Sequence, residues 1–289
     1  MFASMSRSWE FAKMSYAMIR CHKRLLFFPL ISTFAAALVT LSFVLPLWMT
    51  GQLEAWAAAM DGNGEAQDWV MYLLAFLFYF CNYFVVVFFN TGLLACVMRI
   101  GQGEKPRVAD GLSFAMKRFP QIFAWAFVSA IVGVLLRALE QNKKAGRFVS
   151  AILGSAWTAL TFFVVPVITM EGLGPVQAFK RSTRILREQW GTALVGNFSL
   201  GIMSFLLMIP VLLLSALLIF LGLSSGSVAA SVAMIGLAVI LVLIAMATSS
   251  AADMIFKSFL YTYATGKRLP DEVDSKHFSL AFRPADSDT

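Results

Sequence analysis

The sequence predicts an all-α membrane protein with six transmembrane helices, and three observations support this prediction. First, 59% of the 289 residues are hydrophobic and only 13% are charged, whereas soluble domains carry about 25% charged residues. Second, the mean hydropathy is +0.76, so lipid is the expected solvent for much of the chain. Third, the apolar residues gather in six long stretches that polar segments separate.

Each of the six stretches is long enough to cross a bilayer as a helix. A hydrocarbon core of about 30 Å requires roughly 20 apolar residues per helix. The second stretch and the last two exceed this length, which allows them to tilt in the membrane. The predicted spans are Leu25–Met49, Trp69–Met98, Phe119–Leu136, Phe148–Thr169, Thr192–Leu223 and Ser227–Ala264.

The predicted membrane domain covers residues 25–264. Residues 1–24 are predicted to form a cytoplasmic amphipathic segment, and residues 265–289 a polar, disordered cytoplasmic tail. The first span is not predicted to be a cleaved signal peptide. Its apolar run is much longer than the hydrophobic part of a signal peptide, which has about 7–15 residues.

The distribution of Lys and Arg predicts the orientation of the spans. Residues 1–24 and 99–118 contain five Lys or Arg each, residues 170–190 contain four, and the chain from Lys257 onward contains five. The 50–68 connection contains no Lys or Arg and carries four acidic residues. Because cytoplasmic connections are enriched in Lys and Arg, both termini are predicted to be cytoplasmic.

One connection does not fit this distribution. Residues 137–147 hold four basic residues against Glu140 alone, although six spans place this connection on the outer side. Two interpretations stay open: the third and fourth stretches form a re-entrant hairpin, or the positive-inside rule is broken here. The four basic residues are Arg137, Lys143, Lys144 and Arg147.

The segment that begins at Pro175 has the pattern of an interfacial amphipathic helix. Apolar residues recur at helical spacing as far as Trp190, and proline is favoured in the first turn of a helix. Basic residues lie on the neighbouring faces, where we expect them to contact anionic lipid headgroups. These candidate headgroup contacts are Lys180, Arg181, Arg184 and Arg187.

The stretch after Pro106 is similar to the stretch after Pro175. Aligning the two prolines also aligns Ser113 with Ser182, and the leader offers a weaker third copy around Ser15. The chain is therefore predicted to contain three repeats, each a cytoplasmic amphipathic helix followed by two spans. Each match rests on few residues, so chance similarity is the alternative explanation.

The most specific pattern in the chain lies between residues 157 and 191. It consists of Trp157, Thr161, Phe162, Phe163, Pro166, Glu171, Gly174, Pro175, Ala178, Lys180, Arg181, Ser182, Trp190 and Gly191. The pattern resembles an uncharacterised family of bacterial integral membrane proteins. More distantly, it is similar to the multi-span membrane domain attached to some bacterial glycerophosphodiester phosphodiesterases. The resemblance implies a six-span protein of the bacterial inner membrane, and phosphodiesterase activity is not expected because the catalytic domain is missing.

Polar residues inside the predicted spans are further candidates for function, because polar groups are costly in lipid. Asn82 and Asn90 lie eight residues apart and therefore on one helical face. They either line a polar cavity or form interhelical hydrogen bonds with partners such as Asn197, and we favour the second interpretation.

Asp253 and Lys257 have the i,i+4 spacing of a structural ion pair. A proton-coupled site at Asp253 is the alternative.

The sequence contains no recognisable catalytic or metal-binding motif. His22 and His277 are far apart in the sequence, and neither has a second ligand at metal-binding spacing. The sequence also has no phosphate-binding loop and no nucleophile elbow. The net charge of +7 is better explained by cytoplasmic connections than by nucleic-acid binding. We therefore expect no enzyme activity, no cofactor and no nucleic-acid partner.

The leading functional hypothesis is a non-enzymatic inner-membrane protein that organises or assists other proteins. Its basic helices would engage anionic membrane lipid, and its partner would be another membrane protein or a second copy of the chain. The alternative is a small-molecule transporter or channel, with a polar path built from the second, fifth and sixth spans.

Overall fold

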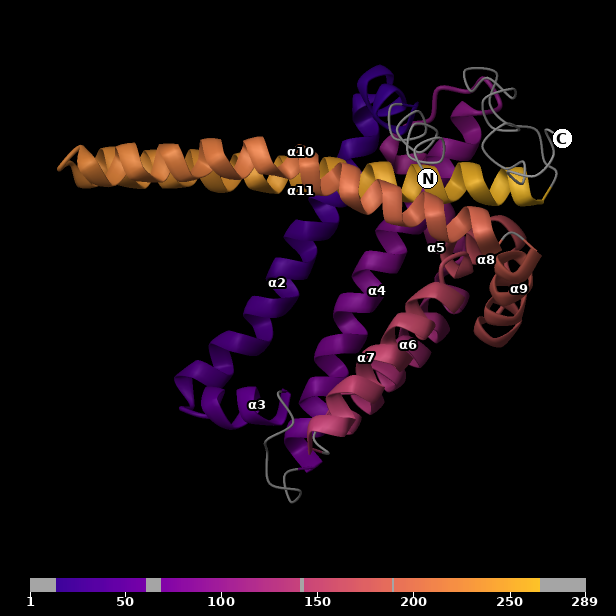
Figure 1. The fold of residues 1–289 in the computed structure, drawn as a ribbon, viewed down its shortest axis with the longest axis horizontal. Coiled ribbons are helices and arrows are strands. Elements are labelled where there is room, and N and C mark those ends of the chain that lie inside the picture. The colour runs from indigo at the N-terminus through magenta and orange to yellow at the C-terminus, as the bar shows by residue number, and fades with distance from the viewer. Residues whose placement is uncertain (1–13, 61–68, 141–142, 189, 266–289) are drawn as a thin grey trace, which may run out of the picture. The chain divides into compact units, whose positions relative to one another are not determined.

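The computed structural model describes residues 14–60, 69–140, 143–188 and 190–265. The regular elements in these ranges are all helices (Figure 1). Residues 14–21 are helical. The elements that follow are η1 (Lys23–Leu26), α2 (Phe27–Met49), α3 (Leu53–Met60), α4 (Trp69–Ile100), α5 (Val108–Lys117), α6 (Phe119–Glu140), α7 (Lys143–Leu160), α8 (Val164–Glu171), α9 (Pro175–Glu188), α10 (Trp190–Ser224) and α11 (Val228–Ala264).

Six helical stretches in these ranges are long and apolar enough to cross a membrane, which confirms the predicted all-α, six-span class. Large apolar side chains are exposed along them: Trp48 of α2 and Phe220 of α10, for example, are each 67% exposed. Such surfaces are stable against lipid and unfavourable in water. The stretches are Lys23–Met49, Tyr72–Ile100, Phe119–Leu139, Phe148–Glu171, Ser204–Ser224 and Val228–Thr262.

The fourth span is interrupted, although the sequence predicts a continuous helix over Phe148–Thr169. α7 ends at Leu160, and α8 begins at Val164 after a short turn. Pro166 lies in the first turn of α8, where its missing N–H is tolerated. In a continuous helix the proline ring would collide with the preceding turn, so the helix ends and starts again.

The described helices belong to two compact units of the chain. Unit 1 comprises residues 1–30, 97–106 and 189–289, and it contains α10 and α11. Unit 2 comprises residues 31–96 and 107–188, and it contains α3 and α5 to α9 with most of α2 and α4. Most of the predicted polar tail and the first part of the leader lie outside the described residues.

Aromatic side chains join α4 to α6 in unit 2. The ring centroids of Phe80 and Phe123 lie 4.9 Å apart, and those of Phe84 and Phe119 lie 5.4 Å apart. Both pairs are edge-to-face, an arrangement that stabilises by about 0.5–1.5 kcal/mol beyond the buried area. These contacts pack the middle of the second span against the first turns of the third.

Helix α3 packs against the ends of α2 and α4 in the same unit. Trp56 of α3 is buried against Leu47 of α2, and its ring lies 5.4 Å from the ring of Phe78 of α4. Val44, Leu53 and Leu74 complete the cluster. α3 is therefore attached to α4 at the level of Phe78.

Helices α10 and α11 form a long hairpin in unit 1 (Figure 1). The two backbones come close at Gly222, whose carbonyl accepts a hydrogen bond from the Ser231 hydroxyl at 2.9 Å. A Cβ atom at Gly222 would lie 2.9 Å from the Cβ atom of Met234, so this contact requires glycine. Gly226 has a φ of +67° and makes the turn between the helices.

The exposure of side chains divides α11 into two parts. Large apolar side chains in residues 228–246 are exposed, whereas nearly all side chains in residues 251–261 are buried. At 1.5 Å per residue the first part is about 28 Å long, which matches a hydrocarbon core of about 30 Å. Asp253 therefore lies beyond the part of α11 that needs to cross lipid.

The segments after Pro106 and Pro175 both form short helices that precede a span. α9 begins at Pro175, as predicted, but α5 begins at Val108. The N–H of Arg107 donates to Asp110 Oδ2 at 2.7 Å, so Arg107 caps the helix and Pro106 lies outside it. That α5 and α9 lie in the membrane plane remains a prediction.

The alignment of the two segments through their prolines does not match the structure. It pairs Ser113 with Ser182, but Ser113 is exposed and Ser182 is fully buried. Aligning the first residues of the two helices pairs Gly111 with Ala178 and Ala115 with Ser182, and all four residues are buried. The positions of the buried residues follow the first residue of each helix. In α5 this residue is Val108, two residues after Pro106, so an alignment through the prolines shifts the buried faces.

Candidate functional site: the junction of α7, α8 and α9

A side chain from α9 bridges the interruption between α7 and α8. The Ser182 hydroxyl donates to the Leu160 carbonyl at 2.7 Å and accepts the N–H of Phe163 at 3.1 Å. Ser182 and Phe163 are fully buried. Because an unpaired buried donor or acceptor costs about 1–3 kcal/mol, this hydroxyl stabilises the interrupted span and holds α9 against it.

A stack of three aromatic rings also fixes α9. The ring of Trp157 in α7 lies between Trp125 of α6, at 5.7 Å, and Phe179 of α9, at 5.6 Å, with the planes nearly parallel. The ring contacts and the Ser182 hydrogen bonds together define the inner face of α9. The buried residues of this face are Ala178, Ser182, Ile185 and Leu186.

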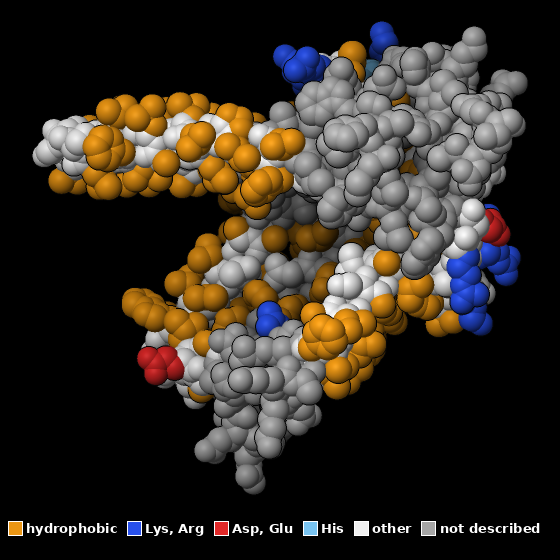
Figure 2. Space-filling model, viewed as in Figure 1, with side chains coloured by type: hydrophobic (Ala, Val, Ile, Leu, Met, Phe, Trp, Pro, Cys, Tyr) orange, Lys and Arg blue, Asp and Glu red, His pale blue; other side chains and the backbone are white. Residues whose placement is uncertain are grey.

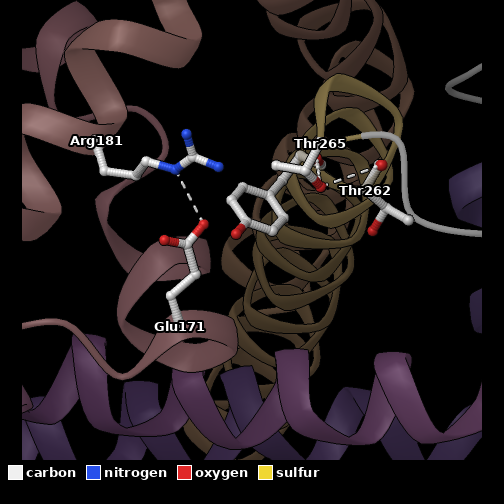
Figure 3. A network of polar contacts seen from close by, with 5 residues as sticks. Glu171, Arg181, Thr262 and Thr265 are labelled. Carbon is white, nitrogen blue, oxygen red and sulfur yellow. Dashed lines mark hydrogen bonds and ion pairs between the residues drawn. The ribbon is translucent and has the colours of Figure 1, made fainter.

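An ion pair ties the end of α8 to α9 (Figure 3). Arg181 Nε lies 3.1 Å from Glu171 Oε1, and the two side chains are 34% and 23% exposed. Glu171 is the last residue of α8, and α9 begins at Pro175. Arg181 is therefore engaged by the protein itself, whereas no ion pair of Lys180, Arg184 or Arg187 is present among the described residues.

Gly172 ends α8 in a left-handed conformation, with a φ of +68°, and its N–H donates to the Ile168 carbonyl at 3.1 Å. The Arg118 guanidinium lies directly over this residue, so that a Cβ atom at Gly172 would overlap it. Gln121 of α6 donates to the Gly172 carbonyl at 3.4 Å. Both the backbone conformation and the close approach of Arg118 require glycine at this position.

The outer face of α9 carries three exposed cations. Lys180, Arg184 and Arg187 are exposed, and their spacing of four and three residues places them on one stripe, opposite the buried face. Figure 2 shows Lys and Arg side chains gathered over α9. We call these three residues the basic stripe, and lipid contact by the basic stripe remains a prediction.

The candidate polar residues of the second and fifth spans lie in α4 and α10. Asn82 donates to the Phe78 carbonyl of its own helix at 2.9 Å, and a hydrogen bond from Asn82 to another helix stays a prediction. Asn90 is half-buried in the same helix. Asn197 lies in α10, and its side chain is outside the described residues.

The predicted ion pair in α11 is present. Lys257 Nζ lies 2.7 Å from Asp253 Oδ2, and the two side chains are 21% and 38% exposed. Asp253 thus has a counter-ion one helical turn away, beyond the exposed apolar part of α11. The contact within one helical turn fits the i,i+4 structural pair that the spacing predicts.

Exchanging either partner of this pair should lower stability more than exchanging both. Asp253→Asn leaves the ammonium without the carboxylate, and Lys257→Met leaves the carboxylate without the ammonium. We expect a coupling free energy of about 0.5–1 kcal/mol, because the pair is partly exposed. A double-mutant cycle of thermal unfolding in detergent measures it, and strictly additive losses would contradict the pairing.

A family model matches residues 69–269, more than two thirds of the chain, and it describes a family of unknown function, DUF6159. The chain belongs to this family. The DUF6159 match includes the whole junction of α7, α8 and α9, and it confirms the resemblance to an uncharacterised family that residues 157–191 indicate. No curated protein and no solved structure matches the chain. The match and the six apolar helices together show an integral membrane protein of unknown activity.

Two residues of the junction have no predicted role from sequence alone. Ser182 lies between Ala178 and Leu186 on the apolar face of the amphipathic pattern, a position that signals a buried hydroxyl with a backbone partner. The residues around Arg118 do not predict its contact with Gly172, because the two positions are distant in the sequence. These contacts explain why the specific pattern extends from Trp157 into α9.

Proposed function

We propose that this DUF6159 protein is a non-enzymatic organising or accessory protein of the bacterial inner membrane, and that α9 anchors it to anionic lipid. The observation that carries the proposal is the basic stripe on a helix whose inner face is fixed. Ser182, the Trp157 stack and the Arg181–Glu171 pair all hold that inner face. The outer face therefore presents its cations in one defined orientation.

A fixed stripe binds a charged surface at lower entropic cost than flexible side chains on a flexible segment. Each Lys or Arg near an anionic membrane surface contributes about 1 kcal/mol, so the basic stripe favours binding by about 3 kcal/mol.

We place α9 and both termini on the cytoplasmic side, because the connections on that side carry the most Lys and Arg. The proposed partner is a membrane protein or a second copy of the chain.

Native mass spectrometry of the protein released from nanodiscs tests the lipid contact. With phosphatidylglycerol and phosphatidylcholine in equal parts, the wild-type protein should retain mainly phosphatidylglycerol. The triple variant Lys180→Gln, Arg184→Gln and Arg187→Gln should lose this preference by about tenfold or more.

A matched control removes the same charge elsewhere. Arg20, Lys23 and Arg24 are exposed before the first span, and their exchange for glutamine should preserve most of the lipid preference. Equal losses in the two triple variants would show dependence on net charge alone and contradict the proposal. Solute flux across proteoliposomes that depends on Asp253 would instead support the transporter or channel alternative.

A further inference from the structure

Arg118 lies at the corner where α5 ends and α6 begins, and its side chain reaches the turn between α8 and α9. The guanidinium carbon lies 5.6 Å from the centre of the Phe114 ring of α5. The guanidinium also covers the backbone of Gly172 so closely that a Cβ atom would not fit there. The Arg118 carbonyl accepts the N–H of Ile122 at 3.0 Å, as the first acceptor of α6. These contacts, all within unit 2, hold the guanidinium in one place.

The guanidinium of Arg118 has neither an ion pair nor a hydrogen bond among the described residues. Glu171, which precedes Gly172 in the chain, pairs with Arg181 instead. The Gly172 carbonyl accepts its side-chain hydrogen bond from Gln121. Arg118 is half-buried, and a guanidinium has five N–H donors that are costly to leave without acceptors. The corner therefore offers fixed, unused donors to an anion.

The position of Arg118 in the chain indicates which anion meets it. The third apolar stretch begins at the next residue, Phe119. Met116, Phe119 and Phe123 are 57%, 39% and 45% exposed, and apolar surface of this kind is stable against lipid. An arginine at the end of an apolar span lies at the level of the headgroups. At this level the available anion is the phosphate of a phospholipid.

We propose that Arg118 binds the phosphate of a phospholipid at the corner of α5, α6 and the Gly172 turn. A guanidinium group matches two phosphate oxygens through paired hydrogen bonds, and its fixed position lowers the entropic cost of binding. Because all phospholipids carry this phosphate, the site accepts zwitterionic as well as anionic lipid. The site therefore goes beyond the basic stripe, which selects anionic lipid by charge.

Photo-cross-linking in nanodiscs of phosphatidylcholine tests the contact. A small share of phosphatidylcholine with a photoreactive headgroup is irradiated with the full-length protein. Chymotrypsin, which does not cut at Arg or Lys, gives comparable peptides for every variant, and mass spectrometry quantifies the label in residues 108–123. Arg118→Gln should lower this label about tenfold, because the charged hydrogen bonds to the phosphate are lost.

The neighbouring Lys117 provides the matched control. Its side chain is exposed, and Lys117→Gln removes the same charge but should preserve most of the label, since a lipid without net charge is attracted little from a distance. Arg118→Lys keeps the charge and lacks the paired donors, so its label should lie between those of the wild type and Arg118→Gln. An unchanged label in Arg118→Gln, or equal losses in Arg118→Gln and Lys117→Gln, overturns the inference.

Two further measurements separate this site from soluble phosphate and from the basic stripe. Inorganic phosphate, added in place of chloride at equal ionic strength, should leave the label unchanged, and displacement of the label would overturn the lipid contact. With a phosphatidylglycerol probe, the label in α9 should persist in Arg118→Gln, which also shows that this variant is folded. The triple variant of the basic stripe should lose the α9 label and keep the label in residues 108–123, so the two proposals fail separately.

Discussion

Replacing Ser182 with alanine should lower the free energy of unfolding by about 2–6 kcal/mol. The exchange removes the hydroxyl that joins the half-buried Leu160 carbonyl to the N–H of the buried Phe163, and each buried polar group that loses its partner costs about 1–3 kcal/mol. In a span that faces lipid, water is not available to replace the hydroxyl. Thermal and denaturant unfolding in detergent measure the loss.

The exposed Ser113 of α5 is the matched control for Ser182. Ser113→Ala removes the same atom from the helix that the proline alignment equates with α9, and it should change stability by less than about 0.5 kcal/mol. Ser182→Thr keeps the hydroxyl and should retain much of the stability. If Ser182→Ala costs no more than Ser113→Ala, Ser182 does not bridge the interrupted span.

Replacing Gly172 with alanine should cost about 2–5 kcal/mol. A side chain in the left-handed conformation at a φ of +68° is disfavoured by about 1–2 kcal/mol. The new Cβ atom would also displace the Arg118 guanidinium, and such overpacking costs about 1–3 kcal/mol. Because Gly172 begins the turn into α9, the variant should also weaken retention of phosphatidylglycerol in native mass spectrometry.

Gly174, two residues further on, gives the control for Gly172. A Cβ atom at Gly174 meets no other atom within 4 Å, and no left-handed φ is present there. Gly174→Ala should therefore be nearly neutral for stability and for lipid retention. Similar losses in the two variants would show that the turn tolerates no side chain in general, and would contradict the specific contact with Arg118.

The six-span class could be predicted because it depends on composition and on the length of apolar runs, which are properties of the sequence itself. The second span, for example, is predicted to begin at Trp69, where α4 begins. The ion pair of Asp253 and Lys257 could be predicted for a similar reason, since an i,i+4 spacing fixes the distance within one helix.

The geometry of the junction could not be predicted, because it depends on how helices fold back on one another. Spacing alone places Arg181 among the basic residues of α9, but the turn at Gly172 brings it to Glu171. Likewise, the proline alignment pairs Ser182 with the exposed Ser113. The pairing fails because α5 begins two residues after Pro106, whereas α9 begins at its proline. The interruption of the fourth span follows from Pro166 together with a hydroxyl supplied from a later helix.

The membrane depth of α9 tests the central claim most directly. A spin label on a cysteine at Gln177, which is exposed on the same side as the basic stripe, is measured by power saturation with the native cysteines replaced. In vesicles of equal parts phosphatidylcholine and phosphatidylglycerol, the label should lie at headgroup level, and in phosphatidylcholine alone it should become more accessible to a water-soluble relaxation agent. Full accessibility to that agent in both kinds of vesicle would contradict the claim that α9 binds an anionic membrane surface.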